Sequence, residues 1–281
     1  MANPLDLTDL ATVKAQLVPE ISGTGSDAVL SAIITAVSTW AQQWCGRTFM
    51  AQSYTENRNG NNRDSMRTKN YPLISVSSLT LNSQTVSATT GNIGAGWIND
   101  DKFIYLRQGL NTAGGGGGLW APGIFTKGIK NVTIIYTAGF ITPGQVAIGN
   151  LPGWTTNIAV ATGAQILVAG YYYTAQSGGV TGTSTPSFPT TTGATVTDKT
   201  VTWICNGAFA EPPDGATYIP YDIQTACNFQ VSYLFGRLPR VGDSSIGEGP
   251  ARTTFVVRDA EPYVKDMLTP YKAVVPIGDY T

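Results

Sequence analysis

Two long stretches of the chain repeat apolar residues at the spacing of an α-helix. In the first, residues 26–49, the apolar positions are Val29, Leu30, Ile33, Ile34, Val37, Trp40, Ala41 and Trp44. This period predicts a helix with one apolar stripe against a core. Ser26 or Asp27 can cap its amino end. Gly46 suits its carboxyl end, because glycine readily adopts the left-handed backbone conformation found there.

The opposite face of this predicted helix carries no charge. Between residues 28 and 45 it offers only Ser, Thr, Ala and Gln side chains. A helix that faces open water usually carries charged residues on that side. We therefore expect another surface, such as a second subunit, to cover this face. The candidate contact residues are Ser31, Thr35, Ser38 and Gln42.

The second helical stretch is residues 222–238. Asp222 is its predicted cap, and Gly236 and Pro239 mark its end. Apolar residues cover most of its circumference, and no charge occurs between Ile223 and Phe235. We expect this helix to pack on two sides. Its Gln230 falls inside the apolar arc, so a buried hydrogen-bond partner is predicted for it.

Shorter elements fill the remainder of the first and last parts of the chain. A helix is predicted at 5–18, capped by Asp6 or Thr8, and another begins after Asp259 and ends at Pro270. Alternation of apolar and polar residues predicts strands at 71–86, with a turn at Asn82–Ser83, and a strand at 130–136. The same pattern predicts a hairpin at 97–106 and a strand with an exposed loop at 54–67.

The middle of the chain differs from the two ends in amino-acid composition. Residues 143–213 hold few charges and many Thr, Gly, Ser and aromatic residues, which predicts short strands at 164–173 and 195–205. The predicted fold class is therefore α+β: a small helical bundle with an antiparallel β part, plus an inserted small all-β domain. The predicted domains are residues 1–142 together with 216–281, and the insertion 143–215.

Composition excludes several function classes. Charged residues make up 12% of the 281 residues and the net charge is −1, so no global field draws the chain to nucleic acid or to an anionic membrane. No apolar run is long enough to span a bilayer, and the first residues lack a signal-peptide pattern. The three cysteines are odd in number and widely spaced, without a CxxC pair, so they indicate neither a zinc site nor a disulfide framework. We therefore expect a soluble protein made in a reducing cytoplasm.

Catalytic chemistry is not indicated. The chain has no histidine, which removes the commonest general base and metal ligand. The five glycines at 114–118 lack the lysine and the helix of a phosphate-binding loop, and Asp100–Asp101 reads as a turn. The sequence predicts no catalytic residue, no metal site and no cofactor.

Two groups of residues leave alternatives open. Arg237, Arg240 and Arg258 flank the second long helix, where they either bridge subunits or lie in solvent. Four aromatic residues of the middle region offer stacking platforms for sugars or form the core of a small β module: Trp154, Tyr172, Phe188 and Trp203.

The order of these elements resembles the head–tail connector (adaptor) proteins of tailed double-stranded DNA bacteriophages. Four stretches carry the resemblance: LDLTDLATVKAQL with SDAVLSAIITAVSTWAQQWCGRTF, then YPLISVSSLTLNSQTV, then KNVTIIYTAGF, and finally YIPYDIQTACNFQVSYLFGR with DMLTPYKAV. They cover most of residues 5–142 and 216–274. Their order and spacing, rather than any single motif, make the resemblance specific.

This resemblance implies a structural virion protein that assembles in the host cytoplasm. The family implies a ring, typically of twelve subunits, docked beneath the portal protein. Such a ring extends the channel for passing double-stranded DNA, without sequence-specific binding, and receives a head-closure or tail-completion protein. The family's carboxyl-terminal tail tends to insert into the portal, and the corresponding residues are Tyr271, Lys272, Val274, Val275, Ile277 and Tyr280.

The insertion resembles a different module, one that recurs in phage virion proteins and is often regarded as carbohydrate-binding-like. Its matching residues include Trp154, Tyr172, Phe188, Asp198 and Trp203. This resemblance gives an alternative hypothesis, in which the chain is a carbohydrate-binding decoration protein of the virion that acts through the inserted module.

Overall fold

A computed structural model of the chain describes residues 2–17, 23–89, 95–107, 123–238 and 260–273, together with the short strands at 109–110, 120–121, 245–246 and 253–254. The chain forms two compact units. The first, here called the helical unit, consists of Met1–Cys45, Thr142–Glu211 and Ile219–Tyr271. The second, the sheet unit, consists of Gly46–Ile141, Pro212–Tyr218 and Lys272–Thr281.

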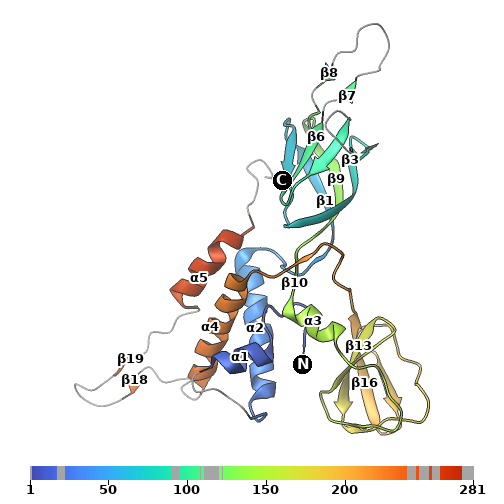
Figure 1. The fold of residues 1–281 in the computed structure, drawn as a ribbon, viewed down its shortest axis with the longest axis vertical. Coiled ribbons are helices and arrows are strands. Elements are labelled where there is room, and N and C mark those ends of the chain that lie inside the picture. Colours follow the sequence, from blue (N-terminus) through green and yellow to red (C-terminus); the bar gives the residue numbers. More distant parts are fainter. Residues whose placement is uncertain are drawn as a thin grey trace. The chain divides into compact units, whose positions relative to one another are not determined.

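The helical unit is built around two long helices that pack against each other. Its helices are α1 (Leu10–Gln16), α2 (Asp27–Cys45), α3 (Pro143–Gly149), α4 (Tyr221–Arg237) and α5 (Pro262–Leu268), followed by a 3-10 turn at Thr269–Tyr271. Helix α4 contacts α1, α2 and α5 (Figure 1). The predicted end of α2 is confirmed, since Gly46 follows Cys45 with a φ of 68°.

The starts of the other predicted helices differ from expectation. Helix α1 begins at Leu10 and is capped by Asp9, whose side chain accepts a hydrogen bond from the Thr12 amide at 2.8 Å. The prediction of Asp6 or Thr8 as the cap was wrong, because both are buried on the extended segment before the helix. Asp222 lies in the first turn of α4, where its charge suits the helix dipole, but the cap position is Pro220.

Two further starts complete this comparison. Helix α5 begins after Glu261, and the predicted cap at Asp259 lies outside the described residues. Helix α3 was not predicted at all. Thr142 and Gln145 form a capping box around Pro143, so three local signals for a helix start were present in the sequence.

The region 143–215 contains a small antiparallel sheet with the order β12-β13-β16-β15. Its strands are β12 (Gln165–Val168), β13 (Tyr171–Ser177), β15 (Thr195–Asp198) and β16 (Val201–Ala208), and β11 (Ala159–Val160) pairs with β14 (Gly179–Val180). Each strand predicted here is in fact a hairpin. The first turns at Ala169–Gly170 and the second at Lys199, residues that all have positive φ.

The sheet unit contains two antiparallel sheets over one core. The first has the order β1-β9-β3-β4, with β1 (Gln52–Gly60), β3 (Leu73–Leu81), β4 (Gln84–Val86) and β9 (Gly128–Ala138). The second has the order β2-β6-β5, with β2 (Ser65–Arg67), β5 (Gly96–Asn99) and β6 (Phe103–Arg107). The core between them includes Leu79, Ile104, Phe125, Ile134 and Tyr136.

Short pairs of strands complete the structure. They are β7 (Gly109–Leu110) with β8 (Trp120–Ala121), β10 (Phe140–Ile141) with β17 (Thr217–Tyr218), and β18 (Ser245–Ile246) with β19 (Thr253–Thr254). The predicted turn at Asn82–Ser83 is confirmed, as both residues have positive φ. The α+β fold class is confirmed, whereas the division into 143–215 and a surrounding domain stays a prediction.

Candidate functional site

Helix α2 buries only part of the predicted apolar stripe. Leu30, Ile34, Val37 and Ala41 lie in the core as expected. Other members of the predicted stripe turn outward: Val29 is 45% exposed, and Ile33, Trp40 and Trp44 are only partly buried. The Trp40 and Trp44 rings stack with their centroids 6.4 Å apart. The helix therefore shows apolar side chains on its outer face.

The neutral face of α2 is covered by the chain's own first residues. Ser38 is 1% exposed and its hydroxyl accepts a hydrogen bond from the Leu7 amide at 2.9 Å. The Gln42 side chain donates to the Leu5 carbonyl at 3.2 Å. These two side chains are thus occupied within the subunit. Ser31 and Thr35 lie further along the same face and are partly buried.

Helix α4 packs on two sides, as predicted. Ile223, Ala226, Cys227 and Val231 are buried. The predicted partner of Gln230 is found at α5, where the Glu261 amide donates to the Gln230 side-chain oxygen at 3.4 Å.

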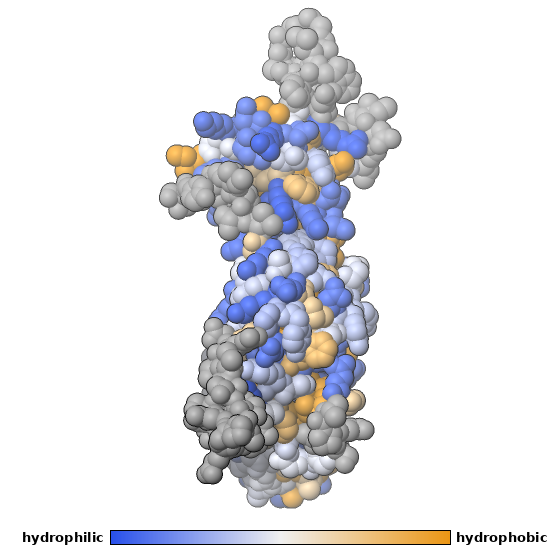
Figure 2. Space-filling view, turned by 90° about the vertical axis from the view of Figure 1, so that its left-hand side faces the viewer, coloured by the Kyte–Doolittle hydropathy of each residue, from blue (hydrophilic) through white to orange (hydrophobic). Residues whose placement is uncertain are grey.

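An aromatic pair lies at the surface beside this contact. Phe229 of α4 and Tyr263 of α5 are 44% and 46% exposed, and their rings meet edge to face with centroids 5.5 Å apart. Here this pair is called the outer apolar face. Figure 2, a view onto the side where α4 and α5 lie in Figure 1, shows hydrophobic residues gathered in its lower half.

Of the three arginines predicted to bridge subunits or lie in solvent, the structure describes Arg237. The Arg237 guanidinium donates to the Tyr233 hydroxyl at 2.7 Å, one helical turn back along α4, and so has a partner within its own helix. Arg240 and Arg258 lie outside the described residues.

The first residues of the predicted docking tail have partners. The Tyr271 hydroxyl donates to the Asp222 carboxylate at 3.1 Å. The Lys272 carbonyl accepts from the Tyr71 hydroxyl at 3.3 Å. Tyr71 is buried, and the Arg47 guanidinium lies 3.8 Å from the centre of its ring. The remaining tail residues lie outside the described residues: Val274, Val275, Ile277 and Tyr280.

The aromatic residues of the middle sheet surround a buried carboxylate that sequence reasoning left without a role. One oxygen of Asp198 accepts from the indole N–H groups of Trp154 at 2.7 Å and Trp203 at 3.3 Å. The other oxygen accepts from the Gly182 amide at 2.6 Å. Trp203 is 1% exposed and has no ring face open to a sugar. The Tyr173 ring covers Phe188, with centroids 4.6 Å apart, and Tyr172 is partly buried.

The described residues offer little for catalysis. Nowhere among them do three Cys, Asp or Glu side chains gather as a metal site. Burial raises the pKa of the Cys227 thiol, which keeps it protonated and unreactive. In the described part of the chain, no helix has the length and apolar character needed to cross a membrane.

Comparisons with known proteins identify a family model that matches part of the chain. Residues 7–106 match the family model described as "HCP: Head completion protein". No curated protein matches the sequence at a significant level. Among solved structures, a chain of the "Neck of empty GTA particle computed with C6 symmetry" aligns with a TM-score of 0.40 and 14% identity, covering 99% of this chain and 95% of that one.

Proposed function

We propose that this chain is a head–tail connector protein of a phage-like virion, a structural component rather than an enzyme, and that it acts as a ring beneath the portal. The match of residues 7–106 to the head completion family supports this proposal. In this proposal the ring, typically of twelve subunits, extends the DNA channel. It joins the portal to a head-closure or tail-completion protein.

The outer apolar face carries the proposal of a ring. Exposed apolar patches on a protein with polar surroundings mark interaction sites. Phe229 and Tyr263 are each more than 40% exposed, and α4 carries no charged residue from Ile223 to Phe235 that would oppose burial. A head-to-tail ring buries two different faces of each subunit, so this face needs one complementary surface on a neighbour. Ser31 and Thr35 remain proposed interface residues.

We expect Phe229→Asp to prevent ring formation, because it places a charge where the neighbouring subunit would exclude water. Ile158→Asp is the matched control, since Ile158 is also exposed, at 45%, but lies in the middle sheet region. Light scattering of the protein mixed with portal rings should show at least a tenfold weaker assembly for Phe229→Asp and no change for Ile158→Asp. Equal assembly of both variants would remove the outer apolar face from the interface.

The proposed docking tail begins at an anchored position. Tyr71 holds the Lys272 carbonyl, and the Ala273 side chain lies 3.6 Å from where a side chain on Gly46 would begin. A tail that orders only on docking loses entropy but can reach deep into a partner. Tyr271, Lys272, Val274, Val275, Ile277 and Tyr280 are proposed to contact the portal.

Removal of residues 274–281 should weaken portal binding at least tenfold. It should keep the hydrogen bond between the Tyr71 hydroxyl and the Lys272 carbonyl. Because every buried side chain of the described residues is kept, the free energy of unfolding should change by less than about 0.5 kcal/mol. A tail of the same composition in scrambled order is the control for chain length. Portal affinity that does not differ between the truncated, scrambled and native proteins would refute the docking role.

The charge balance suits a channel for moving DNA. A protein that neutralises many phosphates binds DNA tightly and in a salt-dependent manner. The net charge of −1 gives no such grip. We propose that DNA passes without sequence-specific binding, and that residues 143–215 form a decoration outside this path.

A further inference from the structure

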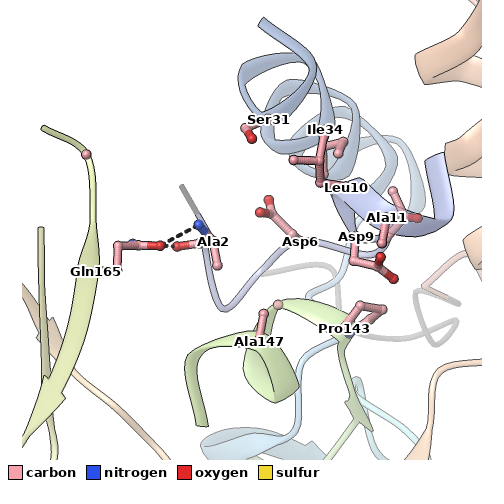
Figure 3. A pocket seen from close by; sticks show the side chains of 13 residues that line it. Ala2, Asp6, Asp9, Leu10, Ala11, Ser31, Ile34, Pro143, Ala147 and Gln165 are labelled. Atoms are coloured by element: carbon pink, nitrogen blue, oxygen red, sulfur yellow. Dashed lines mark hydrogen bonds between the residues drawn. The ribbon is translucent and has the colours of Figure 1, made fainter. Parts of the chain in front are cut away.

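A pocket of about 440 Å³ lies within the helical unit, between the first residues of the chain, α1, α2, α3 and β12. Figure 3 shows Asp6 inside it, with Ser31 and Ile34 of α2 on one side and Pro143 and Ala147 of α3 on the other. The connector function proposed above assigns no ligand to this pocket, although one of its lining residues, Ser31, is also a proposed interface residue.

Asp6 is buried in this pocket with half of its carboxylate unpaired. It is 5% exposed, and one oxygen, Oδ2, accepts a hydrogen bond from the Asn3 amide at 3.0 Å. The other oxygen, Oδ1, is buried and has no hydrogen-bond partner among the described residues. In Figure 3 the carboxylate points toward α2 rather than toward α3. A buried charged oxygen without a donor is costly, so its environment calls for one.

The remaining walls define which donor fits. Asp9 is the other charged residue among those that line the pocket, and no lining residue is cationic. Apart from the lining residues, the Thr35 side chain and the positive charge of the chain's amino terminus also favour the ionised form of Asp6. The helices α2 and α3 contribute Ser31, Ile34, Pro143, Gly144 and Ala147, none of which titrates. The pocket therefore combines negative charge and hydroxyl oxygens with an apolar wall.

We propose that this pocket binds a primary ammonium group carried on an alkyl chain. An ammonium group has three N–H donors, which suits Asp6 Oδ1 and nearby hydroxyl oxygens. Its alkyl stem can lie along Ile34, Pro143 and Ala147, as lysine stems do on apolar surfaces. A divalent cation such as Mg²⁺ needs about six oxygen ligands, more than two separate carboxylates supply.

Two sources can supply this group: a free alkylamine or a lysine side chain of a second copy of the chain. The probe for the first source is n-butylammonium chloride, titrated into the protein at pH 7.5 and followed by amide NMR shifts. We expect saturable shifts confined to residues 2–11, 31–35 and 143–147. We also expect at least tenfold weaker binding to Asp6→Asn and to Ala147→Leu, which fills the pocket without removing the charge.

Matched controls separate this binding from general effects. Asp214→Asn removes one exposed carboxylate elsewhere and should bind the probe like the native protein. Butan-1-ol and NaCl at equal concentrations should not reproduce the shifts. No saturable shift, equal binding by Asp6→Asn, or equal binding of butan-1-ol would each overturn the proposal.

The second source is tested by sedimentation of the native protein over a range of concentrations. Self-association that is abolished both by Asp6→Asn and by saturating n-butylammonium would assign the group to a lysine of a second copy. A native protein that binds the probe but stays monomeric would assign the site to free amines. Failure of ring assembly on the portal leaves both readouts unaffected, because neither requires the portal.

Discussion

Replacing Trp203 with alanine should unfold the middle sheet, with a loss of about 3–5 kcal/mol, the usual cost of truncating a large buried aromatic residue. Trp203 is one of only six residues in the buried cluster of this sheet: Ile166, Tyr173, Ala175, Val201, Trp203 and Cys205. The substitution also deprives Asp198 of one of its three hydrogen-bond donors. Because a small core contributes little stabilising free energy, the loss of one large side chain should be enough to unfold the sheet.

Denaturant unfolding followed by NMR would measure this effect. Trp40→Ala is the control, since it makes the same chemical change at a partly buried position of α2 and should cost much less. If residues 143–215 form a separate domain, the amide signals of α2 and α4 should survive when those of the sheet collapse. A fully folded Trp203→Ala protein would contradict the core role of this residue.

The second large effect is a pH dependence of stability that arises from Asp6. Burial raises the pKa of this carboxyl to about 6, although the Asn3 amide and the Thr35 hydroxyl oppose the shift. The folded state therefore holds a proton that the unfolded state releases near pH 4. The contribution of Asp6 to the free energy of unfolding should therefore be highest below pH 4. It should fall as the pH rises toward and through 6.

Asp6→Asn should remove this decline and stabilise the protein by about 2 kcal/mol at pH 7.5, because a neutral amide escapes the desolvation of a charge. The test is to measure the free energy of unfolding from pH 4 to 8 for the native protein, Asp6→Asn and Asp214→Asn. The last variant should follow the native curve. A less stable Asp6→Asn at pH 7.5 would show that the buried charge has a compensating partner.

Elements defined by local patterns were predictable from the sequence. Helix α2 follows from its apolar period and from Gly46, and the β3–β4 hairpin follows from strict alternation around Asn82–Ser83. Helix α3 was also predictable from local residues. Thr142 and Gln145 form a capping box, and Pro143 occupies the first position of the helix. In these cases neighbouring residues determine the backbone.

Tertiary contacts account for what the sequence did not reveal. The periodic pattern predicts an apolar stripe on α2, but a segment remote in sequence decides which part of it is buried. The Leu7 amide pairs with Ser38, so polar residues enter the core while Val29 turns outward. From the sequence, Asp198 is likewise recognisable only as a residue that matches the phage module. Its role depends on the indoles of Trp154 and Trp203, one of them 44 residues away.

The central claim is that this protein acts as a connector and forms a ring between the portal and the next neck component. Electron microscopy of the protein assembled on purified portal rings tests it most directly. The account predicts a closed ring beneath the portal, with the outer apolar face at the subunit contacts and the carboxyl-terminal tail inside the portal. Subunits that remain monomeric beside unoccupied portal rings would contradict it.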